Sequence, residues 1–206
     1  MGKILRVNLT NKTIKEETLP EDVLRDWIGG RGLGVYLMLK EVDPKVDPLS
    51  PENKAIVLTG PLTGVPGVPS SGRWVSVTKS PLTNTIHDSH CGGKFGPELK
   101  FAGFDAIIIE GASDEPVYLW IHDGKAEIRS AKHLWGLDVH ATTDMIKEEL
   151  AKEIGKDEAE QIKVACIGPA GENLVKMAAI ISDYNRAAEE VVMVLSGDQR
   201  NSKQLL

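Results

Sequence analysis

The sequence has little cysteine and few aromatic residues: 2 of its 206 residues are cysteine, and 5% are Phe, Trp or Tyr. Cys91 and Cys166 lie far apart and form no CxxC pair. By themselves they cannot ligate an iron–sulfur cluster or a four-cysteine zinc ion. Two unpaired cysteines are typical of a reducing compartment, so we expect a cytoplasmic protein, with Cys166 as a buried core thiol.

The sequence also lacks a long apolar run and a cluster of basic residues. No stretch is long enough to span a bilayer, and residues 1–10 have neither the apolar core nor the cleavage site of a signal peptide. The formal net charge is −6, which argues against a dominant nucleic-acid surface. We therefore expect neither a membrane nor a nucleic-acid partner. The 41% hydrophobic content is sufficient for a folded core.

Glycine and proline are concentrated in residues 59–105, which hold eight of the 20 glycines and five of the 11 prolines. Arg73 lies inside this segment, and a rigid glycine-rich loop with a guanidinium can offer many N–H donors to an anion. A set of β-turns explains the same glycines, and the local pattern alone favours this plainer interpretation.

A polar cluster precedes the glycine pair at positions 92 and 93. It consists of His87, His90 and Cys91. Their spacing allows a zinc site, but no fourth ligand is evident, so zinc is the less favoured interpretation.

Hydrophobic periodicity predicts a series of short strands and helices. We expect hairpins over 4–9/13–17 and 117–121/126–128, helical segments over 18–28, 33–39, 96–101 and 138–154, and strands over 55–58, 73–78, 106–109, 162–167 and 175–181. Thr18 and Glu21 have the spacing of a capping box, and Gly155 is a predicted helix stop.

The second half of the sequence repeats the order of the first. A hairpin, WIG at 27–29, a helix and LTGP at 58–61 return as a hairpin, LWG at 134–136, a helix and CIGP at 166–169. We infer two copies of one α+β unit that share a core across a pseudo-twofold axis. The alternative is a parallel sheet of βαβ units, against which the hairpins argue.

The glycine-rich region and the repeat together resemble the N-terminal domain of the tungsten-containing aldehyde ferredoxin oxidoreductases. The resemblance runs from about residue 4 to residue 188. It is carried by GGRGLGVYLMLKEVDPKVDPLSPENK (29–54), TGPLTG (59–64), GRWVSVTKSPLT (72–83), GGKFGPELKFAGFDAIIIEG (92–111) and IGPAGENLVKMAAI (167–180).

The resemblance implies an α+β fold of two intertwined repeats, with mainly antiparallel sheets and a few helices, over residues 1–188. This domain is the base for a tungsten (or molybdenum) atom held by two pterin dithiolenes that magnesium bridges. The family oxidises aldehydes to carboxylic acids with ferredoxin as electron acceptor. Later domains supply the iron–sulfur cysteines and the acid–base groups, so no catalytic residue is expected in this chain.

The resemblance also implies the residues that hold the cofactor. His90 stands where the family usually has an asparagine whose backbone carbonyl binds magnesium, and the carbonyl of Ala187 is the second such ligand. The full predicted set is Arg73, His90, Cys91, Gly92, Gly93, Arg186 and Ala187.

The chain departs from the family after position 188. The family continues glycine-rich, whereas residues 189–206 read EEVVMVLSGDQRNSKQLL. Permitted codons read one base earlier can encode GGGGDGAVWGSKKLKAIA, which is close to the family pattern, so we expect a frameshifted tail; a divergent natural C-terminus is the alternative.

We expect a cofactor-base domain that is inactive alone. The alternatives are a non-catalytic module that self-associates through an exposed apolar face, or a subunit completed by a separate polypeptide that carries the cluster cysteines.

Overall fold

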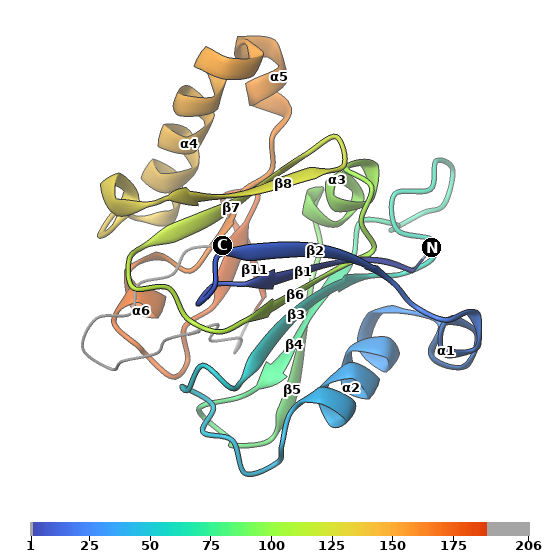
Figure 1. Cartoon of the computed structure of the whole chain (residues 1–206). Helices are drawn as coiled ribbons and strands as arrows, with labels where there is room; N and C mark the ends of the chain where they lie inside the picture. The colour runs from blue at the N-terminus through green and yellow to red at the C-terminus, as the bar shows by residue number, and fades with distance from the viewer. Residues whose placement is uncertain (1, 189–206) are drawn as a thin grey trace.

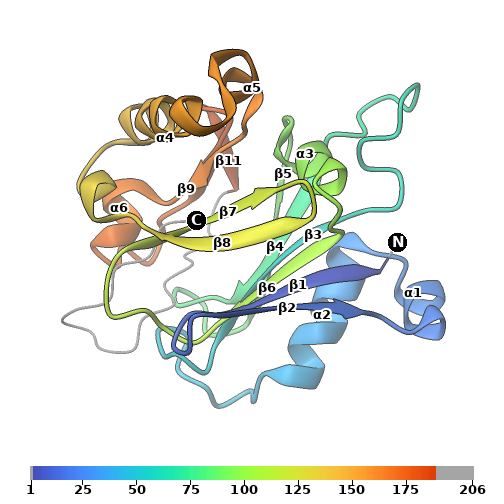
Figure 2. The same ribbon diagram turned by 45° about the horizontal axis from the view of Figure 1, so that its top comes forward.

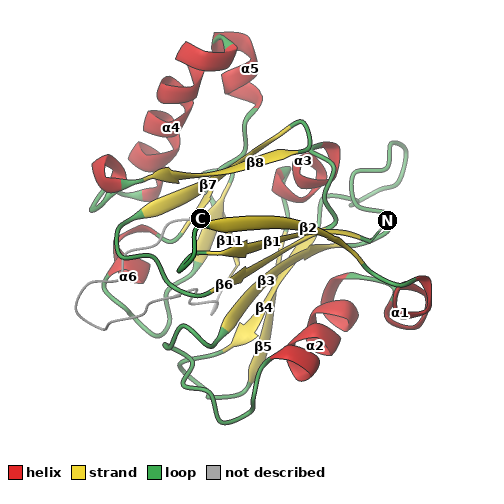
Figure 3. Cartoon of the chain, viewed as in Figure 1, coloured by secondary structure: helices red, strands yellow, loops and turns green. Residues whose placement is uncertain are grey.

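The structure is a computed structural model that describes residues 2–188 of the chain. It is an α+β fold in which helices flank β-sheets (Figure 1 and Figure 3). The first half contains β1 (Lys3–Asn8), β2 (Thr13–Thr18), α1 (Glu21–Trp27), α2 (Gly30–Glu41), β3 (Lys54–Thr59), β4 (Trp74–Lys79), β5 (Ile86–Cys91), α3 (Phe95–Phe101) and β6 (Ala106–Glu110). The second half contains β7 (Val117–His122), β8 (Lys125–Ser130), the 3-10 turn η1 (Lys132–Leu134), α4 (Val139–Ile154), α5 (Lys156–Gln161), β9 (Ala165–Cys166), α6 (Gly168–Glu172), β10 (Ile180–Ser182) and β11 (Arg186–Ala188).

A six-stranded sheet forms the centre, in the order β2-β1-β6-β3-β4-β5. Among the described strands only β1 and β6 pair in parallel, and every other pairing is antiparallel. The predicted α+β class with mainly antiparallel sheets is therefore confirmed. The alternative parallel sheet is wrong, because hairpins rather than crossover helices connect most neighbouring strands.

The central sheet is buried on both faces, which explains the continuous apolar runs of β3 and β6. Helix α2 covers one face, where Ile56 and Ile108 belong to its core cluster. The second half of the chain covers the other face, where Val57 and Ile107 belong to the larger cluster. Figure 2 shows the β7–β8 hairpin lying between this sheet and helix α4.

The second half begins with the predicted hairpin, whose turn residues Asp123 and Gly124 have φ of 47° and 75°. Helix α4 starts where Asp138 accepts a hydrogen bond from the N–H of Ala141 at 2.8 Å. It stops at Gly155, as predicted, with φ of 88°. Within residues 2–188 no helix is both long and apolar enough to cross a bilayer.

The two halves have the same order of elements. In the first, hairpin β1–β2 is followed by α2 and the antiparallel series β3, β4, β5; in the second, hairpin β7–β8 is followed by α4 and the antiparallel series β9, β10, β11. This order agrees with the repeat inferred from the sequence. The predicted twofold relation between the two halves stays a prediction.

Several local predictions are wrong. Thr18 is the last residue of β2 and the helix begins after Pro20 without a side-chain cap, so the capping box does not form. Helix α2 starts at Gly30 rather than at position 33, because only Ile28 and Gly29 separate it from α1. Strands β9 and β10 are much shorter than the apolar runs that predicted them. Strand β5 was not anticipated, since its sequence IHDSHC is mostly polar.

Candidate functional site

The candidate site forms where the last strands of the two halves meet. Strand β5 is the edge of the central sheet and β11 is the edge of the three-stranded sheet. The Cys91 thiol at the end of β5 donates a hydrogen bond to the backbone carbonyl of Arg186 in β11, at 3.2 Å. It also lies 3.5 Å from the hydroxyl of Ser182 in β10. The contact brings together two predicted residues that are 95 positions apart.

A second bridge joins the same two segments. The N–H of Lys94 donates to Asp183 Oδ2 at 2.6 Å. Asp183 Oδ1 is buried and has no hydrogen-bond partner. Asp183 and Tyr184 occupy the turn between β10 and β11, with φ of 51° and 65°. The turn therefore holds a carboxylate against the backbone that follows the glycine pair.

The two glycines of the pair have different surroundings. A Cβ on Gly93 would lie 2.1 Å from Asp183 Oδ2, and a Cβ on Gly72 would lie 2.4 Å from the Gly93 carbonyl oxygen. Close backbone packing therefore requires glycine at position 72, and the Asp183 carboxylate together with a φ of +92° requires it at position 93. A Cβ on Gly92 would meet nothing within 4 Å, so Gly92 is the position at which another molecule can approach the backbone.

Arg73 enters the site from the glycine-rich loop. Its backbone carbonyl accepts a hydrogen bond from the Thr63 hydroxyl at 3.0 Å, which fixes the start of β4. Its guanidinium is exposed and forms no hydrogen bond or ion pair with other described residues. Its charge is close enough to favour the ionised form of the Cys91 thiol. Arg73 is thus a cation with free donors beside the predicted site.

His90 lies on the other face of β5 from Cys91, because side chains alternate along a strand. Its Nε2 is 3.3 Å from Asp88 Oδ2, and the Arg31 Nε donates to the same oxygen at 2.6 Å. His87 shares the face of Cys91, and its Nε2 is buried without a partner. No three metal-ligating side chains within residues 2–188 converge on one point. The zinc interpretation is therefore wrong for His87, His90 and Cys91.

Burial sets the chemistry of both cysteines. It raises the pKa of the Cys91 thiol, and the nearby Asp183 charge adds to this, while the Ser182 hydroxyl and the Arg186 and Arg73 charges oppose it. Burial raises the pKa of Cys166 to about 12. Both thiols are therefore protonated at neutral pH, and Cys166 is the core thiol that the sequence predicted.

A cavity formed by the described residues lies elsewhere. It has a volume of about 320 Å³ and lies between the central sheet, hairpin β7–β8, α4 and α5. None of the seven predicted cofactor residues lines it. We place the candidate site at the β5–β11 junction, because that is where the free guanidinium, the open glycine and the backbone of both halves come together.

Sequence reasoning missed three residues of this junction: Lys94, Ser182 and Asp183. Ser182-Asp183 precedes the predicted Arg186 by a few positions, at the counterpart of the β4–β5 connection. The repeat itself was the signal that could have drawn attention to that turn.

Comparison with known proteins places this fold in a family. Residues 4–193 match the model of the aldehyde ferredoxin oxidoreductase N-terminal domain. The tungsten-containing aldehyde ferredoxin oxidoreductase of Pyrococcus abyssi is 55% identical over 187 residues, which are 91% of this chain and 30% of that protein. An aliphatic sulfonate oxidoreductase, WOR-like subunit, of Pyrococcus furiosus is 43% identical over 196 residues, again 91% of this chain and 31% of that protein.

A solved structure supports the same assignment. The active-site complex BamBC of benzoyl coenzyme A reductase, in complex with 1,5-dienoyl-CoA, matches with a TM-score of 0.88 and 35% identity, over 100% of this chain and 30% of that one. The chain belongs to the aldehyde ferredoxin oxidoreductase family, as its N-terminal domain. It spans about 30% of the length of the relatives that it matches.

Proposed function

We propose that this chain is the cofactor base of a tungsten pterin oxidoreductase. The observation that carries the proposal is the contact between the Cys91 thiol and the Arg186 carbonyl at 3.2 Å. It joins the two segments that the family resemblance assigns to the cofactor. The similar protein of Pyrococcus abyssi is a tungsten-containing aldehyde ferredoxin oxidoreductase, which supports tungsten as the metal.

The residues of the junction suit a pterin that carries phosphate. The free guanidinium of Arg73 would donate hydrogen bonds to phosphate or pterin oxygens. Gly92, with open space where a Cβ would be, lets the ligand reach the backbone. Cys91 and Gly93 form the base of the site. Cys91 donates a hydrogen bond to the Arg186 carbonyl, and Gly93 packs against Asp183.

Magnesium would be held by backbone carbonyl oxygens of His90 and Ala187, one from each half of the chain. Oxygen ligands suit this hard cation. Substitution of the usual asparagine by His90 leaves the carbonyl in place. When bound, the tungsten pterin supplies the redox centre that oxidises an aldehyde to a carboxylic acid and passes electrons toward ferredoxin.

The chain alone should not turn over aldehyde. Its two cysteines are buried and are too few to hold an iron–sulfur cluster, which takes four cysteine ligands. A cofactor on one domain face stays largely exposed, whereas cofactor sites normally bury most of their ligand. Substrate contacts and the cluster would come from the remaining domains or from a partner subunit.

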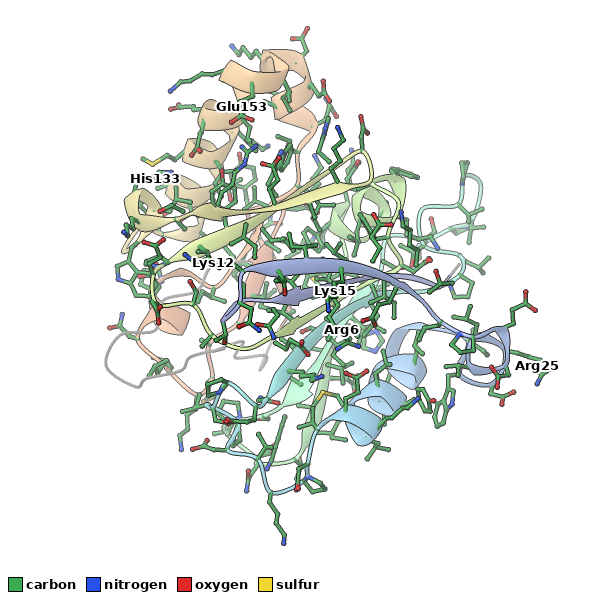
Figure 4. All side chains as sticks on the ribbon, in the orientation of Figure 1. Arg6, Lys12, Lys15, Arg25, His133 and Glu153 are labelled. Carbon is green, nitrogen blue, oxygen red and sulfur yellow. The ribbon has the colours of Figure 1, made fainter. Side chains whose placement is uncertain are left out.

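The experiment is to produce the chain in a tungstate-fed host that makes the pterin and to measure tungsten and pterin in the purified protein. We expect both in the wild type, at least ~10-fold less in Arg73→Ala, and no loss in Arg25→Ala, a matched control on the outer side of α1 (Figure 4). None of the three should reduce dye with aldehyde. Dye reduction by the chain alone, or a wild type without tungsten, would overturn the proposal.

A second candidate is a non-catalytic module that self-associates. The side chains of Leu62 and Phe101 are 61% and 64% exposed. The loop that contains Leu62 lies next to helix α3, as the distance of 3.3 Å between Phe101 and the position of a Cβ on Gly64 shows. Exposed apolar side chains that gather favour association. Light scattering over a concentration series tests this candidate, and a strict monomer that retains pterin and tungsten would contradict it.

A further inference from the structure

The turn between β10 and β11 depends on contacts with distant parts of the chain. The two strands pair over only three residue pairs. Inside the turn, among the described residues, one backbone hydrogen bond runs from the N–H of Asn185 to the Asp183 carbonyl at 2.9 Å. Asp183 and Tyr184 are both at positive φ. Residues other than glycine persist in this conformation only where the surrounding structure fixes them.

The corresponding connection in the first half, residues 80–85, is stabilised by its own hydrogen bonds. The Ser80 hydroxyl accepts from the N–H of Leu82 at 3.1 Å and from the N–H of Thr83 at 3.2 Å. The Ser80 carbonyl accepts from the N–H of Asn84 at 2.8 Å. The β10–β11 turn therefore needs long-range support where its counterpart uses local bonds.

The first support is Asp183, whose carboxylate is bonded to the N–H of Lys94. On the same side, the position of a Cβ on Gly93 lies 3.3 Å from Arg186 Cγ. The backbone at the glycine pair thus packs against both Asp183 and Arg186. A shift of the turn would move the Arg186 carbonyl away from the Cys91 thiol.

The second support is Tyr184, whose side chain contacts helix α4. Its hydroxyl donates to Asp144 Oδ1 at 2.8 Å. Its ring centroid is 5.4 Å from that of His140, and the Lys147 ammonium lies 5.3 Å from the same ring centroid. The three helix residues are four and three positions apart, so they lie on one face of α4. Hydrogen bond, ring contact and cation–π contact therefore all bind Tyr184 to this face.

Helix α4 is a rigid support for the turn. A separate face of the helix, which includes Ile146 and Leu150, is buried in the larger core cluster. Lys147 also donates to the backbone carbonyl of Glu160 in α5 at 3.3 Å. The face that contacts Tyr184 is thus fixed independently of the turn.

We propose that Tyr184 is a positioning residue for the cofactor site. Helix α4 fixes its side chain, and the turn in consequence keeps Asp183 on Gly93 and the Arg186 carbonyl on the Cys91 thiol. Tyr184 needs no contact with the cofactor, because it acts through its neighbours in the chain. This role rests on the proposed function, whereas the support of the turn by α4 exists in the chain without any ligand.

Four variants separate the contributions. Tyr184→Ala removes ring and hydroxyl, and since alanine is as unfavourable as tyrosine at positive φ, it tests the side chain rather than the backbone. Tyr184→Phe keeps the ring and loses the hydroxyl. Asp144→Ala removes the acceptor of the same hydrogen bond from α4. Tyr36→Ala is the matched control, because this tyrosine of α2 stacks on Trp27 instead.

Amide hydrogen exchange of the ligand-free full chain tests the support itself. The N–H of Lys94 should exchange at least ~10-fold faster in Tyr184→Ala, and by a smaller factor in Tyr184→Phe and Asp144→Ala. The amides of β3, in the middle of the central sheet, should not change. An unchanged Lys94 amide in Tyr184→Ala, or the same acceleration in Tyr36→Ala or throughout β3, would overturn the proposal.

The pterin and tungsten content of the same proteins, purified from a tungstate-fed host, tests the role in binding. Tyr184→Ala should retain at least ~10-fold less of both than the wild type, as is typical for residues that orient a ligand set. Tyr184→Phe should lie between the two, and Tyr36→Ala should equal the wild type. Full pterin content in Tyr184→Ala, together with fast Lys94 exchange, would overturn the positioning role. A wild type without pterin would overturn the proposed function and with it this role, even where the exchange confirms the support by α4.

Discussion

The carboxylate of Asp183 occupies the space that a side chain on Gly93 would need. Oδ2 lies 2.1 Å from the position of a Cβ on Gly93, whose φ is +92°. The same oxygen accepts the N–H of Lys94 at 2.6 Å. The glycine and the acid, 90 positions apart, therefore hold the two halves together at the candidate site.

Gly93→Ala should destabilise the chain by about 2–3 kcal/mol, since the new methyl group displaces a bonded carboxylate and a non-glycine residue is strained at this φ. Urea unfolding at neutral pH measures the change. A loss below about 0.5 kcal/mol would contradict the packing that the structure shows.

Gly92→Ala is the matched control, because a Cβ there meets nothing within 4 Å. Its stability should stay within about 0.5 kcal/mol of the wild type. If Gly92 contacts the cofactor as proposed, the same variant should lose bound pterin while remaining folded. The pair separates a packing role from a ligand-binding role at adjacent glycines.

Both thiols should resist modification in the native protein. Burial raises the pKa of Cys91 and Cys166, the latter to about 12, and only the thiolate is strongly nucleophilic. Ellman's reagent at pH 7.5 should find no rapidly reacting thiol in the folded chain and two in guanidinium chloride. A rapidly reacting thiol in the folded state would show that the Cys91–Arg186 junction opens.

The elements that are easiest to predict from the sequence are those whose burial requires apolar side chains. Ala106–Ile109 reads as a buried strand because β6 lies at the middle of the sheet, with Ile108 in one core cluster and Ile107 and Ile109 in the other. The hairpin turn at Asp123 and the helix stop at Gly155 were also predictable, because each depends on a local backbone conformation.

Strand β5 could not be found in this way. Its sequence IHDSHC is half-exposed at a sheet edge, and its register is set by β4 rather than by hydrophobic alternation. The candidate site was likewise only partly predictable from the sequence. The family pattern gave Cys91 and Arg186, but Asp183 depends on a turn with positive φ that brings a distant carboxylate onto Gly93. Such long-range contacts have no local signal in the sequence.

We expect the ionisation of Asp105 to make the free energy of unfolding depend on pH. Its carboxylate accepts from the N–H of Gly2 at 2.7 Å and pairs with Lys100 at 2.8 Å. Burial opposes ionisation, but Lys100 and the backbone donors outweigh it, so the native pKa of Asp105 is lowered. The contribution of Asp105 to the free energy of unfolding is complete above its pKa in the unfolded chain, about 3.9. It is lost as the pH falls through the lower pKa that Asp105 has in the native protein.

Asp105→Asn should therefore lower the free energy of unfolding by about 1–3 kcal/mol at pH 7. The difference from the wild type should persist at pH 5 and shrink below about pH 4, as Asp105 takes up a proton in the wild type. Asp114→Asn, at an exposed position, is the control and should change little. A difference that stays constant down to pH 2 would refute the assignment.

Arg6 of β1, labelled in Figure 4, binds three carboxylates. Its guanidinium donates to both oxygens of Glu41 at 2.9 and 3.0 Å and to Glu17 at 2.8 Å, and contacts Glu110 at 3.3 Å. Lys54 neutralises part of this cluster through Glu41 and Glu110. Removing Arg6 leaves half-buried carboxylates facing one another with a single cation.

Arg6→Met should keep the aliphatic packing and remove the charge. We expect a loss of about 2–3 kcal/mol at pH 7, because uncompensated carboxylates are costlier than a missing ion pair. Arg6→Lys should recover only part of it, since an ammonium cannot bond Glu41 through both oxygens as the planar fork does. Urea unfolding of the wild type and the two variants measures the order of their stabilities. Equal stability of Arg6→Lys and the wild type would contradict this prediction, because charge alone, without the bidentate geometry, would then stabilise the cluster.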